Sequence, residues 1–166
     1  MSREPTGGIT REGEHLVLTI TREFSAPIGD VWAAVTEPER LERWIGTYTG
    51  DPESGRVAFL MTAEGATEPE EIEIRECVPP RVLKVTAHAG DAQWHLELSL
   101  DERDGVTTLT FAHRDIDPAA VESVGPGWEY YLDRLVAAET DGAVGGIDFG
   151  RDYYPAMEQY YRSQAG

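Results

Sequence analysis

Cysteine is almost absent from this chain: Cys77 is the only one among 166 residues. A single thiol cannot form an internal disulfide, so a reducing cytoplasm is the simplest compartment for the protein. No stretch approaches the ~18 consecutive apolar residues that a membrane-spanning helix needs. The polar segment 1–14 also has no apolar core of a signal peptide. We therefore expect a cytoplasmic protein without membrane contact.

Basic side chains are scarce as well. The chain has 14 Lys and Arg against 31 Asp and Glu, which gives a formal net charge of −17. Such a field repels phosphate groups, so nucleic acids and anionic membrane surfaces are poor partners. The histidines show no metal-ligand spacing, and neither a Gly-x-Ser-x-Gly elbow nor a phosphate-binding loop is present. The sequence thus predicts no metal and no cofactor.

The pattern of apolar residues predicts one domain of mixed helices and strands. Alternating apolar residues predict a strand over residues 15–24, and two short helices should follow over 27–36 and 38–44. A run of strands comes next, at 47–50, 56–62, 69–78, 82–87, 93–100 and 106–114. The last helical region, 118–139, contains Gly125-Pro126-Gly127, which predicts a short segment and then a long helix from Pro126.

This order of elements favours an α+β helix-grip fold. We expect a curved antiparallel sheet of about six or seven strands wrapped around a long C-terminal helix, with two short helices after the first strand. A straight helix cannot contact the whole of a strongly curved sheet, so the remaining space should form a cavity. This domain should span residues 14–140, after a flexible arm at 1–13. The aromatic tail at 141–166 has partly helical spacing, which fits a short helix docked on the domain or on a second subunit of a homodimer, and fits a frayed end equally well.

Two groups of motifs carry a resemblance to a known family. Residues 21–38, TREFSAPIGDVWAAVTEP, resemble the opening of the START-like (SRPBCC) superfamily, in which a strand ending in an aromatic residue leads to Ala-Pro, a Val-Trp helix and a Thr-x-Pro step. Residues 41–44, LERW, and 125–135, GPGWEYYLDRL, are similar to the bacterial single-domain branch related to activators of the Hsp90 ATPase. The likeness covers roughly residues 13–140.

The resemblance implies a helix-grip fold with a pocket between the sheet and the long helix. Members of the superfamily bind lipids, hormones and polyketides, and a few are cyclases or hydrolases. It therefore implies a small hydrophobic molecule as the partner. A protein-interaction module with a chaperone partner, by analogy with Hsp90 activation, is a further alternative.

Strand alternation predicts which side chains face the helix, provided that no bulge shifts the register. The predicted ligand-binding residues are mostly aromatic and apolar: Trp44, Phe59, Met61, Trp94, Phe111, His113, Trp128, Tyr131 and Leu132. Each could equally fill the core, but together they favour an apolar or amphipathic ligand, either lipid-like or aromatic and polyketide-like. By the same alternation Cys77 should face outward, and Glu129 on the long helix should face water.

Two ionisable residues, His113 and Glu76, interrupt otherwise apolar strand faces. In the functional interpretation they are a polar anchor or a general acid/base at the cavity mouth, as in a polyketide cyclase or hydrolase. In the structural interpretation each lies at a strand end, in water or paired with Arg22 or Arg114. We favour a non-catalytic binding protein and keep the enzyme as the alternative.

Overall fold

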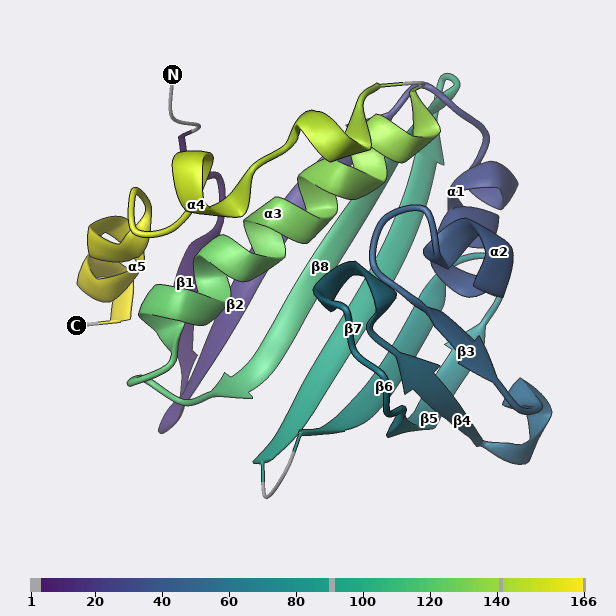
Figure 1. Cartoon of the computed structure of the whole chain (residues 1–166), viewed down its shortest axis with the longest axis horizontal. Helices are drawn as coiled ribbons and strands as arrows, with labels where there is room; N and C mark the ends of the chain where they lie inside the picture. The colour runs from purple at the N-terminus through teal and green to yellow at the C-terminus, as the bar shows by residue number, and fades with distance from the viewer. Residues whose placement is uncertain (1–3, 90–91, 141, 166) are drawn as a thin grey trace.

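The protein has one open antiparallel sheet with a long helix across its concave face (Figure 1). The computed structural model describes residues 4–89, 92–140 and 142–165, and within these the sheet has eight strands in the order β1-β2-β8-β7-β6-β5-β4-β3. The strands are β1 (Gly8–Glu12), β2 (His15–Phe24), β3 (Thr47–Thr49), β4 (Arg56–Leu60), β5 (Glu70–Val78), β6 (Val82–Ala89), β7 (Ala92–Arg103) and β8 (Val106–Ile116). The helices are α1 (Ile28–Thr36), α2 (Pro38–Leu41), α3 (Val121–Glu139), α4 (Phe149–Asp152) and α5 (Glu158–Ala165). The predicted helix-grip fold is confirmed, with one strand more than the expected upper number.

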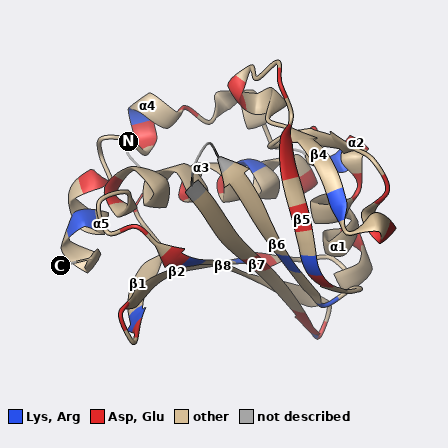
Figure 2. Ribbon diagram, turned by 90° about the horizontal axis from the view of Figure 1, so that it is seen from below, with Lys and Arg blue, Asp and Glu red and all other residues tan. Residues whose placement is uncertain are grey.

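The order of the strands in the sheet follows the order of the chain from β3 to β8. The strands β3 to β8 follow one another as antiparallel neighbours, and β8 then pairs with β2 over nearly the whole length of β2. The strands β2 and β1 therefore complete the sheet at the edge opposite β3. Figure 2 shows α3 above the curved sheet, with acidic positions in red along β5. No helix in the described part of the chain is long and apolar enough to cross a membrane.

The N-terminal arm is not loose from residue 8 onward, as the sequence had led us to expect. Gly8 to Glu12 pair with Thr19 to His15 of β2, and Gly13, with a φ of 67°, supplies the positive φ that a two-residue hairpin turn requires. The polar composition of this segment concealed the strand, because an edge strand can be stabilised by pairing with its neighbour whatever its own side chains are.

The long helix is continuous, and the predicted break at Gly125-Pro126-Gly127 is wrong. Pro126 lies inside α3, where it removes one backbone hydrogen bond without ending the helix. Gly125 serves close packing: a Cβ placed there would lie 2.5 Å from the Tyr161 ring. Its missing side chain lets α5 approach the backbone of α3.

The C-terminal tail packs on the domain. Tyr153, Met157 and Tyr161 are almost completely buried, and α5 lies against α3 and β1 (Figure 1). The expectation that Glu129 faces water is wrong, because this side chain is 1% exposed and accepts hydrogen bonds from Tyr161, Arg22 and the backbone of Gly7. Both ends of the chain therefore meet at one carboxylate on α3.

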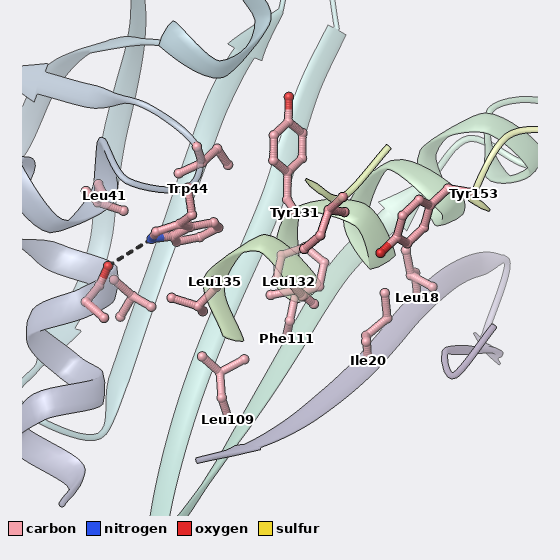
Figure 3. Close-up of a cluster of buried hydrophobic side chains, with 14 of the residues drawn as sticks. Leu18, Ile20, Leu41, Trp44, Leu109, Phe111, Tyr131, Leu132, Leu135 and Tyr153 are labelled. Atoms are coloured by element: carbon pink, nitrogen blue, oxygen red, sulfur yellow. Dashed lines mark hydrogen bonds between the residues drawn. The ribbon is translucent and has the colours of Figure 1, made fainter. Parts of the chain in front are cut away.

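The closed core lies under the half of the sheet that is formed by β2 and β8. Leu18, Leu109, Leu132 and Leu135 are at most 2% exposed and pack between these strands and α3 (Figure 3). Towards β4, β5, β6 and β7 most of the concave side chains are only partly buried. The sheet and α3 are therefore in full contact on one side and diverge on the other.

Candidate ligand-binding cavity

A cavity of about 460 Å³ lies where the sheet and α3 diverge. Its wall combines the concave faces of β4 to β8 with α1, α2 and the inner face of α3. The lining side chains are largely aromatic or aliphatic, among them Trp32, Val35, Trp44, Ile45, Val57, Phe59, Met61, Ile72, Ile74, Leu83, Val85, Ala87, Trp94, Leu96, Leu98, Phe111, Trp128, Leu132 and Leu135. The more polar lining residues include Thr36, Tyr48, Glu64, Glu70 and Cys77.

Aromatic rings from three elements meet around Trp128 on α3. The ring of Phe111 on β8 lies 4.5 Å from that of Trp128, centroid to centroid, and the ring of Trp94 on β7 lies 6.2 Å away in an edge-on arrangement. Tilted and edge-on contacts of this kind are the favoured geometries of aromatic pairs. They fix the orientation of the Trp128 indole at the boundary between core and cavity.

Trp44 forms the wall opposite this cluster. Its indole Nε1 donates a hydrogen bond of 3.0 Å to the Ala34 carbonyl of α1 (Figure 3), and its own carbonyl accepts one from Arg134 on α3 at 2.8 Å. The polar groups of this residue are thus bound by protein atoms. These hydrogen bonds join the segment of α1 and α2 to α3. The apolar ring of Trp44 lines the cavity.

His113 lies beneath the aromatic cluster and outside the cavity lining. It is 2% exposed, its Nδ1 accepts a hydrogen bond of 3.2 Å from Trp128 Nε1, and its ring centroid lies 5.1 Å from that of Trp94. Burial lowers the pKa of His113 to about 4, and the nearby His95 adds to the effect. The ring is therefore neutral at pH 7, with its proton on Nε2, and it orients Trp128.

Tyr131 also lies outside the lining, but it anchors the cavity rim. Its hydroxyl donates a hydrogen bond to the carboxylate of Glu64, which ends a short 3-10 helix at Thr62–Glu64. Burial raises the pKa of Tyr131 well above its ordinary value, and the Glu64 carboxylate raises it further. The phenol therefore stays protonated and joins the rim segment to α3.

A β-bulge decides which side chains of β5 face the cavity. Ile74 pairs with Val85 of β6, but the next pair is Glu76 with Lys84, so Arg75 is an extra residue in β5. Beyond such a bulge the alternation of side chains is inverted. Glu76 consequently lies on the outer side of the sheet and is exposed.

The same bulge corrects the prediction for Cys77. This residue pairs with Leu83 and lines the cavity together with it, so the expectation that Cys77 faces outward is wrong. The predicted acid/base pair is not brought together, because Glu76 lies outside the cavity and His113 is buried behind Trp128. Nor does any group of three or more His, Cys, Asp or Glu among the described residues have an arrangement that could hold a metal ion.

Comparison with known proteins identifies the family. A sequence model of the family described as "Activator of Hsp90 ATPase homolog 1-like protein" matches residues 25–139. The chain belongs to this family. A search of curated proteins found no match.

Solved structures similar to this AHSA1-like protein share its fold. The crystal structure of CalU16 from Micromonospora echinospora is 24% identical, with a TM-score of 0.73 over 98% of this chain and 97% of that one. A conserved protein of unknown function from Enterococcus faecalis is 22% identical, with a TM-score of 0.71 over 95% and 89% of the two chains. DynU16, from the dynemicin biosynthetic locus, is 20% identical with a TM-score of 0.60 over 77% of this chain and 49% of that one.

The structure places seven of the nine predicted ligand-binding residues in the lining: Trp44, Phe59, Met61, Trp94, Phe111, Trp128 and Leu132. The other two, His113 and Tyr131, lie directly behind it. Sequence reasoning missed Trp32 on α1, Tyr48 on β3 and Cys77. Trp32 belongs to the apolar stripe of its helix, and helical spacing alone cannot separate a core-facing side chain from a cavity-facing one.

Proposed function

We propose that this AHSA1-like protein binds a small apolar or amphipathic molecule, lipid-like or aromatic, in the cavity between the sheet and α3, without converting it chemically. The observation that carries the proposal is the cavity itself. Its volume of about 460 Å³ lies within the range of about 300–1,000 Å³ that is common for small-molecule sites. An apolar wall with a few polar groups is also what such sites usually have.

Packing elsewhere in the molecule supports the proposal. Leu18 and Leu109, which do not line the cavity, are 0% exposed, so the chain packs tightly where the sheet and helix meet. Several apolar side chains of the cavity wall, such as Phe59, Met61 and Trp94, are only partly buried, and burial is worth about 25 cal/mol per Å² of apolar surface. A ligand that covers these side chains would recover that free energy.

The chemistry of the surrounding groups favours binding over catalysis. General acid/base catalysis needs ionisable groups that converge on the reacting atoms. Glu76 lies outside the cavity, and Nδ1 of neutral His113 already accepts the Trp128 indole proton. The resemblance to a superfamily whose members include polyketide-binding proteins gives a reason to include aromatic polyketides among the compounds tested.

A cavity-filling variant tests the proposal. Lipids, sterols and aromatic polyketides are added during thermal unfolding, and a true ligand at a hundred times its Kd should add about 2.7 kcal/mol of stability. The Ala87→Phe variant places a ring into the cavity and should abolish this gain, whereas Ala58→Phe, which follows cavity-lining Val57 and faces the other side of β4, should keep it. If no compound stabilises the protein, or if both variants respond equally, the cavity is not the binding site.

Chaperone contact stays a prediction of the resemblance. Retention of the protein on the host's own Hsp90 at low salt would support it, and unimpaired retention of the Ala87→Phe variant would separate that contact from ligand binding.

A further inference from the structure

We infer that the cavity selects a flat aromatic molecule that carries a positive charge, such as a protonated amine, over a carboxylate or phosphate of the same shape. This inference rests on the proposed function, because it names the chemical class of the molecule that the cavity binds.

The first support is the sign of the charge in the wall. Among the lining residues that the structure describes, only Glu64 and Glu70 carry a formal charge at neutral pH, and both are negative. A buried anion needs a positive partner or several hydrogen-bond donors to offset the loss of its hydration. The described part of the lining has no positively charged side chain that could be this partner.

Two guanidinium groups on the helices that border the cavity are bound to other groups. Arg134 on α3 donates to the Trp44 carbonyl at 2.8 Å and to the Tyr130 hydroxyl at 3.3 Å, and it lies over the Tyr130 ring. Arg40 on α2 donates to the Glu139 carboxylate. Neither belongs to the lining, so neither provides the counter-charge of a carboxylate ligand.

Both carboxylates come from the segment between the end of β4 and the start of β5, and both residues are exposed. Glu64 ends the 3-10 helix that follows β4, and Glu70 begins β5, where it pairs with Phe59 of β4. The hydroxyl of Tyr131 holds Glu64 towards α3. The cavity thus has a negative pole beside an otherwise apolar interior, which matches an amphipathic molecule with its cationic group at the rim.

The aromatic wall provides the second support, independent of the carboxylates. Trp44, Trp94 and Trp128 line the cavity together with Phe59. The faces of such rings carry partial negative charge, so they attract cations and stack with flat apolar bodies. Both preferences point to the same class of molecule.

Three probes that share a pyrenylmethyl body and differ in the charge of the attached polar group test the inference: 1-pyrenylmethylammonium, 1-pyrenemethanol and 1-pyreneacetate. Their Kd values are measured from tryptophan quenching and pyrene anisotropy at about 0.15 M salt, where the Debye length of about 8 Å screens the general field of the acidic protein. We expect the ammonium to bind at least about tenfold more tightly than the acetate, with the alcohol between them. In the Glu64→Gln/Glu70→Gln variant this preference should fall about fivefold.

The matched control is the Glu68→Gln/Glu71→Gln variant. It changes the net charge by the same amount in the same segment, but neither residue lines the cavity, so the preference should be unchanged. Glutamine at position 64 keeps an oxygen that can accept the Tyr131 hydrogen bond, and unfolding curves show whether each variant is folded.

The outcomes separate this inference from the proposed function. If the alcohol binds to the wild-type protein but the acetate binds as tightly as the ammonium, the charge preference is refuted while ligand binding stands. The same holds if both double variants lose the preference equally, because the general field would then be its cause. If the neutral alcohol fails to bind, or binds the Ala87→Phe variant unchanged, the proposed function itself fails for this probe class.

Discussion

The carboxylate of Glu129 and the hydroxyl of Tyr161 lie 2.5 Å apart in the interior of the protein. The same carboxylate accepts hydrogen bonds from the backbone of Thr6 and Gly7 and from the guanidinium of Arg22. Burial alone would raise the pKa of Glu129, but the hydrogen bonds from Thr6, Tyr161 and Arg22 outweigh it, so the pKa lies below its ordinary value. One side chain of α3 thus binds the N-terminal segment, β2 and α5, close to the Trp128 wall of the cavity.

Removal of this carboxylate should strongly destabilise the fold. The Glu129→Ala variant leaves the buried donors of Gly7 and Tyr161, and the partly buried donors of Thr6, without their acceptor. We expect a loss of about 3 kcal/mol or more in the free energy of unfolding, measured with urea. Glu122 lies on the same helix and pairs with Arg162 at the surface, so Glu122→Ala should cost less than about 1 kcal/mol. Equal losses in the two variants would show that the Glu129 network does not stabilise the termini.

Glu129 also shows where prediction from sequence reached its limit. The motifs and strand alternation gave the helix-grip fold, the family and most of the cavity wall, because these depend on local periodicity. Glu129 has neighbours in sequence that favour an exposed helix face, and its partner Thr6 is 123 residues away. No local pattern records such a contact, and a bulge such as the one at Arg75 leaves no mark in the apolar pattern either.

Alanine substitutions at two glycines of α3 should change the melting temperature in opposite directions. At Gly125 a Cβ would lie 2.5 Å from the ring of Tyr161, whereas at Gly127 nothing lies within 4 Å. Alanine is favoured over glycine inside a helix by about 1 kcal/mol, so Gly127→Ala should raise the melting temperature. Gly125→Ala should lower it, because α5 must move away. Calorimetry checks both, and stabilisation by Gly125→Ala would contradict the close packing of α5.

Stability should fall in acid because of His113. Its pKa is lowered from 6.5 to about 4 in the folded protein, so between these values the unfolded chain binds the proton and the folded chain does not. The free energy of unfolding therefore decreases as pH falls from 6.5 towards 4, by roughly 3 kcal/mol in total at about 1.4 kcal/mol per pH unit.

The pH effect of His113 is separated from that of the carboxylates by comparing variants. Urea unfolding at several pH values should show a shallower loss for His113→Leu than for the wild-type protein. His15→Gln, at an exposed position beside Asp115, should follow the wild-type curve. Parallel curves for all three proteins between pH 6.5 and 4 would mean that His113 takes up its proton without unfolding.

Cys77 offers a direct report on occupation of the cavity, because it is the single thiol of the chain and lies in the cavity wall. Reaction with N-ethylmaleimide, followed by mass spectrometry, should slow about tenfold when 1-pyrenemethanol is present at ten times its Kd. The bulge supplies the control: a Glu76→Cys substitution in a Cys77→Ser background moves the thiol by one residue to the outer side of β5. The rate at which this thiol reacts should not change when the probe is added, since a ligand in the cavity cannot cover that side of the sheet. Protection at both positions would mean that the probe changes the reactivity of the whole strand, and protection at neither would place the bound probe away from β5.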